Sequence, residues 1–131
     1  MAVVGPTQPE GHVLAAVQDA ARGDLARLGA QQLPRLPWMV GNVPHDDATF
    51  IRYALWRVNS GGGFDVPRAL HSALTLVRSA RAELDGLESG LLFVARAEGL
   101  TWAEIAEHLG VRSPQAAQQR FERVTSRTES R

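Results

Sequence analysis

One stretch constrains the fold of this chain most, because it encodes two short amphipathic helices that are separated by only four residues. It runs from Thr101 to Val124 and reads TWAEIAEHLGVRSPQAAQQRFERV. Thr101 and Glu104 have the spacing of a capping box, in which each side chain satisfies a backbone donor at a helix start. Gly110 follows the last apolar position and suits a left-handed helix end. We therefore predict a first helix over residues 101–109.

The second helix of this stretch has its own start signal and a polar outward face. Ser113 can cap it, and Pro114 fits its first position, where a backbone donor would have no partner. Glutamine amides can pair with adenine edges, and guanidinium groups can reach phosphates. The candidate base contacts are Gln115, Gln118 and Gln119. The candidate phosphate contacts are Thr101, Arg112, Ser113, Arg120, Arg123 and Arg127.

The two helices of this stretch also have a family resemblance. The segments WAEIAEHLGV and QAAQQRFERV resemble the helix-turn-helix segments of bacterial transcription regulators, including small regulators of small-heat-shock genes. More distantly, they resemble the promoter-reading region 4 of sigma factors. The resemblance covers about residues 87–124. The turn in such regulators usually runs Gly-Val-Ser-Arg-Gln, whereas residues 110–115 are one residue longer. The resemblance implies a sequence-specific DNA-binding transcriptional regulator, with helix 114–124 in the major groove of double-stranded DNA.

A different function is compatible with the same pattern. Two short amphipathic helices joined by a tight turn occur in many all-helical proteins that never bind nucleic acid. The alternative is therefore a protein-interaction module that binds RNA polymerase or another regulator through the C-terminal helices.

A heptad repeat precedes this stretch and predicts a long helix over about residues 67–98, roughly 48 Å in length if continuous. The repeat is typical of a coiled-coil seam and favours a homodimer that pairs two helix-turn-helix units. The predicted seam consists of Leu70, Ala73, Val77, Ala80, Leu84, Leu87 and Leu91, and Val94 continues its period. A kink at 85–86 is compatible with this long helix. The alternative is a break near Asp85 and Gly86, because Asp85 and Glu88 form another capping-box pattern and glycine weakens a helix.

The remaining segments predict an all-α fold with an N-terminal helical bundle. We expect a bend or a new helix start at Gly23 and Asp24. The proline-rich loop 33–44 carries the apolar side chains of residues 38–40, which we expect to pack across the helices or to meet a partner subunit. No wing is expected after the helix-turn-helix. The predicted regions are a flexible tail (1–11), a helical region (12–66), the long helix (67–98), the helix-turn-helix (99–127) and a second tail (128–131).

Composition limits the remaining functional classes. The chain has 131 residues with 14 arginines and 14 acidic residues, so no global positive field attracts it to nucleic acid. Locally, residues 112–131 hold five arginines and two glutamates, which coincides with the proposed reading helix. No cysteine, metal-binding motif or catalytic motif is present in the sequence, so we expect neither an enzyme nor a cofactor. Without a signal segment or an apolar run of membrane length, a cytoplasmic, nucleoid-associated protein is expected.

Overall fold

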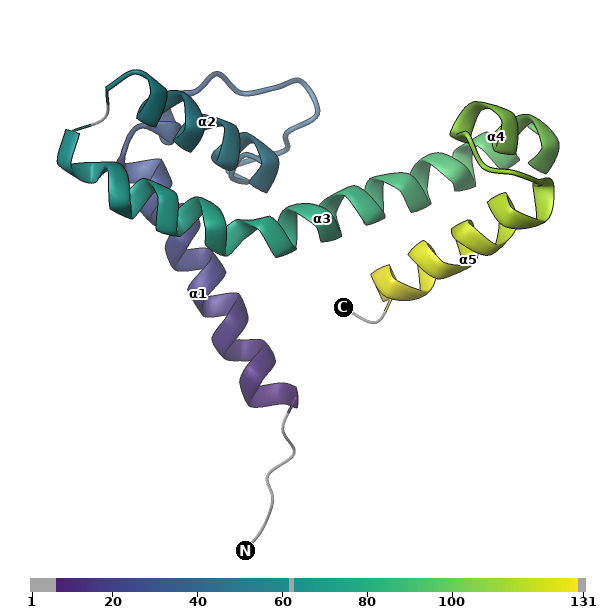
Figure 1. The fold of residues 1–131 in the computed structure, drawn as a ribbon, viewed down its shortest axis with the longest axis horizontal. Coiled ribbons are helices and arrows are strands. Elements are labelled where there is room, and N and C mark those ends of the chain that lie inside the picture. The colour runs from purple at the N-terminus through teal and green to yellow at the C-terminus, as the bar shows by residue number, and fades with distance from the viewer. Residues whose placement is uncertain (1–6, 62, 130–131) are drawn as a thin grey trace, which may run out of the picture. The chain divides into compact units, whose positions relative to one another are not determined.

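The structure of this chain, a computed structural model, describes residues 7–61 and 63–129 and is all-α over this part (Figure 1). This confirms the predicted fold class. The described elements are α1 (Thr7–Arg27), the 3-10 turn η1 (Ala30–Gln32), α2 (Asp47–Asn59), the 3-10 turn η2 (Gly63–Asp65), α3 (Val66–Ala97), α4 (Trp102–Leu109) and α5 (Pro114–Glu129). Among the described residues, no helix is both long and apolar enough to cross a membrane.

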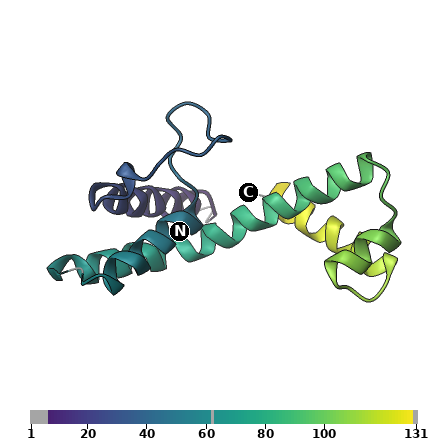
Figure 2. The same cartoon turned by 90° about the horizontal axis from the view of Figure 1, so that it is seen from above.

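The long predicted helix exists as α3, which spans 32 residues without interruption (Figures 1 and 2). The alternative of a break at Asp85 and Gly86 is therefore wrong. The chain divides into two compact units, Met1–Ala80 and Arg81–Arg131, and α3 contributes to both. Each unit has its own apolar core.

The first unit packs α1, α2 and the first half of α3 around one core. The smallest of its side chains, the alanines, allow the helices to approach closely, and leucines and aromatic rings fill the remaining space. The buried members are Ala21, Leu25, Ala30, Phe50, Tyr53, Ala54, Ala69, Ala73 and Leu76.

A buried ion pair connects the three helices of this unit. The Asp47 side chain is only 1% exposed, and its two carboxylate oxygens accept hydrogen bonds from Arg22 Nε at 2.7 Å and Arg22 Nη2 at 2.8 Å. The Ser79 hydroxyl, from α3, also donates to this carboxylate. Asp46 is the N-cap of α2, although its side chain makes no capping hydrogen bond. Asp47, the next residue, has a tertiary role instead.

The structure corrects two local predictions about α1. Helix α1 begins at Thr7, so residues 7–11 are not part of a loose tail, and Pro9 lies in the first turn, where a helix tolerates proline. Residues 1–6 of the predicted tail lie outside the described residues. The helix also continues through Gly23, because burial of Ala21 and Leu25 on either side outweighs the weak helix propensity of glycine.

The apolar loop 33–44 does not pack across the helices as one alternative predicted. Trp38 is 75% exposed and Val40 is 78% exposed. Arg35 holds the loop in shape instead, because its guanidinium donates to the backbone carbonyls of Gly41 and Val43, each at 2.5 Å.

Candidate nucleic-acid interface

Helix α4 begins with the predicted capping box. Glu104 N donates to Thr101 Oγ1 at 3.1 Å, and Thr101 N donates to Glu104 Oε1 at 2.8 Å. These hydrogen bonds lower the pKa of the Glu104 carboxyl, first through the backbone donor of Thr101 and then through its side chain. The negative charge also lies at the positive end of the helix dipole. The capping-box prediction is confirmed.

The turn between α4 and α5 follows the predicted signals. Gly110 adopts φ 79° and ψ 28°, the left-handed conformation that glycine adopts without a steric penalty. Its N–H donates to the Ala106 carbonyl at 3.0 Å, as does the N–H of Val111. Ser113 Oγ then accepts a hydrogen bond from Ala116 N at 3.1 Å and caps α5. Local chemistry therefore fixes where α4 ends and where α5 begins.

A small apolar core holds α4 and α5 against the second half of α3. Its buried members are Leu92, Ile105, Ala106 and Ala117. At the edge of this core the rings of Trp102 and Phe121 lie 5.8 Å apart at 45°, a favourable tilted arrangement. The Arg96 guanidinium lies 5.0 Å from the Trp102 ring centre in a cation–π contact. The three helices therefore form one packed unit.

Polar contacts connect α5 along its length to α3. The Arg120 guanidinium pairs with both Glu88 carboxylate oxygens, at 2.7 and 3.1 Å, and this pairing raises the pKa of Arg120. Arg127 lies 3.4 Å from Asp85.

The Ser89 and Thr125 hydroxyls are 2.9 Å apart, and Val124 is buried between the flanking contacts. Because these contacts reach beyond Val124, α5 continues to Glu129, and the prediction that residues 128 and 129 belong to a tail is wrong. Residues 130–131 lie outside the described residues.

The predicted base-contacting residues share an open face of α5. Gln115, Gln118 and Gln119 are all exposed, as are Glu122 and Ser126 on the same side of the helix. The buried side of α5 carries Ala117 and Val124. This separation leaves the amides available to a ligand, as a helix entering a groove requires.

The predicted phosphate-contacting residues divide into two groups. Arg112 and Arg123 are exposed and make no ion pair among the described residues. Arg120 and Arg127 are paired with acidic residues of α3, so their charges are already largely compensated. The Ser113 hydroxyl accepts a capping hydrogen bond and keeps its own hydrogen to donate, whereas the Thr101 hydroxyl both accepts from Glu104 N and interacts with the Glu104 carboxylate. The acidic partners in α3 were not predicted from the sequence, because nothing local indicates them.

The predicted dimer seam is also divided. In the first half of α3, Ala73 is buried in the core of the first unit, and Val77 and Ala80 are half-buried. In the second half, Leu84, Leu87 and Leu91 are 63–69% exposed. Leu70, at the start of the seam, is 36% exposed.

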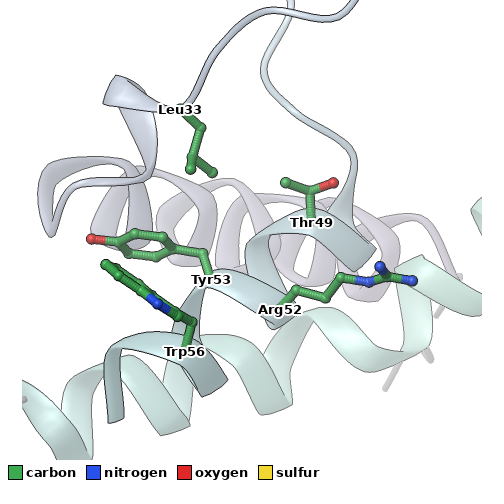
Figure 3. A pocket seen from close by; sticks show the side chains of 5 residues that line it. All are labelled: Leu33, Thr49, Arg52, Tyr53 and Trp56. Carbon is green, nitrogen blue, oxygen red and sulfur yellow. The ribbon is translucent and has the colours of Figure 1, made fainter. Parts of the chain in front are cut away.

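The surface of the first unit contains a hollow with the volume of a small-ligand site. It encloses about 360 Å³ and is lined by Leu33, Thr49, Arg52, Tyr53 and Trp56. The Tyr53 and Trp56 rings lie next to each other, while the Arg52 guanidinium points away from them (Figure 3). A ligand site needs polar groups that converge on the ligand, and the lining supplies none here.

Comparisons of the chain with protein-family models, with curated proteins and with solved structures find no match.

Proposed function

We propose that this protein is a sequence-specific DNA-binding transcriptional regulator, in which α5 enters the major groove and two copies act as a homodimer in the cytoplasm, on the nucleoid. The observation that carries the proposal is the open amide face of α5 on a unit whose helix ends are fixed by caps. Gln115, Gln118 and Gln119 read base edges. A well-placed two-bond contact from such an amide discriminates between bases by about 1–3 kcal/mol.

Arg112 and Arg123 are the principal phosphate contacts in this mechanism, together with the hydroxyls of Thr101 and Ser113. Arg120 and Arg127 orient α5 through their acidic partners in α3 and reach phosphate only when those pairs open. This division of roles follows from the ion pairs, because a compensated arginine contributes less to counterion release.

The proposal is tested by selecting a preferred sequence from random double-stranded DNA and then measuring affinity over a range of salt concentrations. We expect Arg123→Ala to weaken binding uniformly and to reduce the slope of log affinity against log salt by about one. Arg68→Ala removes the same charge from an exposed position in the first unit and serves as the control. Gln119→Ala should instead relax the preference at one base position. Absence of sequence selection, or equal effects of the two arginine changes, would refute the proposal.

One observation favours the alternative function, a protein-interaction module for RNA polymerase or another regulator. The second unit, residues 81–131, contains seven arginines and eight acidic residues, so it has no net positive charge. Binding to a largely apolar protein surface should persist at salt concentrations that dissociate DNA. The same salt titration therefore separates the two functions.

A further inference from the structure

The second half of α3 carries an apolar row that no described part of its own chain covers. Leu84, Leu87, Leu91 and Val94, here called the leucine stripe, are 55–69% exposed. Their spacings of three and four residues put them on one side of the helix. Removal of such side chains from water favours association, so a continuous exposed row indicates an interaction surface.

We infer that the leucine stripe is the contact between two copies of this chain, which pair in parallel along residues 84–94 of α3. This inference rests on the homodimer of the proposed function and specifies its surface and direction. It does not depend on DNA binding.

Charge favours a second copy as the occupant of the stripe. Between Leu84 and Val94 the only ionisable residues are Asp85 and Glu88, and both form ion pairs with arginines of α5. Two stripes can therefore meet without bringing uncompensated like charges together, which would oppose association.

The available area suits a weak self-contact. If each of the four side chains of the leucine stripe exposes roughly 100 Å², one copy offers on the order of 400 Å² and a pair about 800 Å², which is below the ~1,200 Å² at the lower end of specific interfaces. In a symmetric pair each copy contributes its own stripe to the contact. The fraction of dimer should therefore depend on protein concentration.

The direction of pairing follows from two glycines beside the stripe. Gly86 and Gly90 lie inside α3, and nothing lies within 4 Å of the position that a Cβ would occupy at either residue. Neither glycine is therefore needed for packing within its own unit, although each weakens the helix.

A symmetry argument distinguishes the two directions. In a parallel pair the twofold axis runs parallel to α3. The side of one helix that carries the leucines then faces the side of the partner helix that carries the glycines, so that leucines pack on open backbone. In an antiparallel pair, leucines would face leucines and glycines would face glycines. The glycines therefore favour the parallel arrangement.

Disulfide cross-linking tests both the surface and the direction, because the chain has no cysteine of its own. We expect Leu87→Cys and Val94→Cys, each as a single variant, to form covalent dimers under mild oxidation. A disulfide requires Cα atoms within about 7 Å. In an antiparallel pair only one of the two sites can lie that close to its own copy, because seven residues separate them by about 10 Å on each helix.

Leu74→Cys is the matched control, since Leu74 is 70% exposed on the opposite side of α3. The parallel dimer predicts efficient cross-linking at both stripe positions and little at this control. Cross-linking at only one stripe position would overturn the direction. Cross-linking no stronger than that of the control would overturn the surface.

A second measurement does not depend on oxidation. The unaltered chain should show the mass of a dimer by analytical ultracentrifugation at high protein concentration. Leu87→Glu should shift the dissociation constant upward by at least tenfold, and Leu74→Glu should leave it within twofold. Circular dichroism checks that both variants remain helical. Neither experiment contains DNA, so a failure of the pairing model and a failure of DNA binding are recognised separately.

Discussion

The two halves of α3 have the same heptad pattern but different surroundings. In the first half, Ala69, Ala73 and Leu76 are buried in a core that includes α1 and α2. In the second half, Leu92 is the buried apolar residue, while the heptad leucines remain exposed. A heptad repeat therefore establishes that a helix has an apolar side. It does not establish whether the same chain or a partner covers that side.

The polar contacts of the two halves of α3 also differ in burial, and those of the first half are again the more buried. Ser79 in the first half donates to the fully buried carboxylate of Asp47. In the second half, the Glu88 and Arg120 side chains are 15% and 40% exposed. Buried pairs are expensive to break, whereas exposed pairs contribute little. The first unit should therefore depend on its ion pair much more than the second unit does.

The largest expected effect is on the free energy of unfolding, and it distinguishes two leucines of the same helix. Leu76→Ala leaves a cavity in the first core and should lower the free energy of unfolding by about 3–4 kcal/mol. Leu87→Ala changes an exposed side chain and should alter it by less than about 0.5 kcal/mol in the dissociated protomer. Urea denaturation at low protein concentration measures both. Similar losses would mean that the second half is buried in the protomer.

The next effect compares the two ion pairs. Asp47→Ala removes the buried partner of the Arg22 guanidinium and leaves it only the exposed carboxylate of Asp19, so it should destabilise the first unit by about 3 kcal/mol. Arg120→Ala should cost less than about 1 kcal/mol, because its pair is partly solvated. Glu10→Ala, at an exposed position of α1, is the control for the loss of one acidic charge from the first unit. The contrast would be contradicted if Arg120→Ala proved as destabilising as Asp47→Ala.

The sequence predicts the features that depend on neighbouring residues. The Thr101 capping box, the helix end at Gly110 and the Ser113 cap each involve residues three or four positions apart. The length of α3 follows from its unbroken apolar periodicity.

Features that join distant residues were missed. Arg22 and Asp47 are 25 residues apart, and Glu88 and Arg120 are 32 apart, so no local pattern connects them. Tertiary burial also kept α1 helical through Gly23, against local propensity. For the candidate site, the amide face of α5 could be predicted, but the pairing of Arg120 and Arg127 with α3 could not.

Replacement of a glycine in the second half of α3 should stabilise the folded protomer but weaken the dimer. Gly90→Ala has space for its methyl group within the protomer, and it should raise the free energy of unfolding by about 0.5–1 kcal/mol. The same methyl group should weaken the parallel dimer, because it blocks the close approach of the partner helix. Denaturation at low concentration and sedimentation at high concentration measure the two effects. If both increased together, the glycine side of α3 would not be part of the contact.

The smallest effect concerns pH and is confined to the second unit. Hydrogen bonds from Thr101 lower the folded-state pKa of Glu104, whereas an unfolded chain should give it the ordinary value of about 4.3. The resulting stabilisation is fully present above the unfolded value and is lost as pH falls through the folded value. NMR titration of the Glu104 carboxyl should therefore show a midpoint below 4.3. Thr101→Ala removes the hydroxyl but keeps the backbone donor, which is the larger cause, so the midpoint should rise only part of the way. A midpoint in Thr101→Ala identical to that of the unaltered chain would mean that the hydroxyl does not contribute, and that the backbone of α4 alone holds this charge.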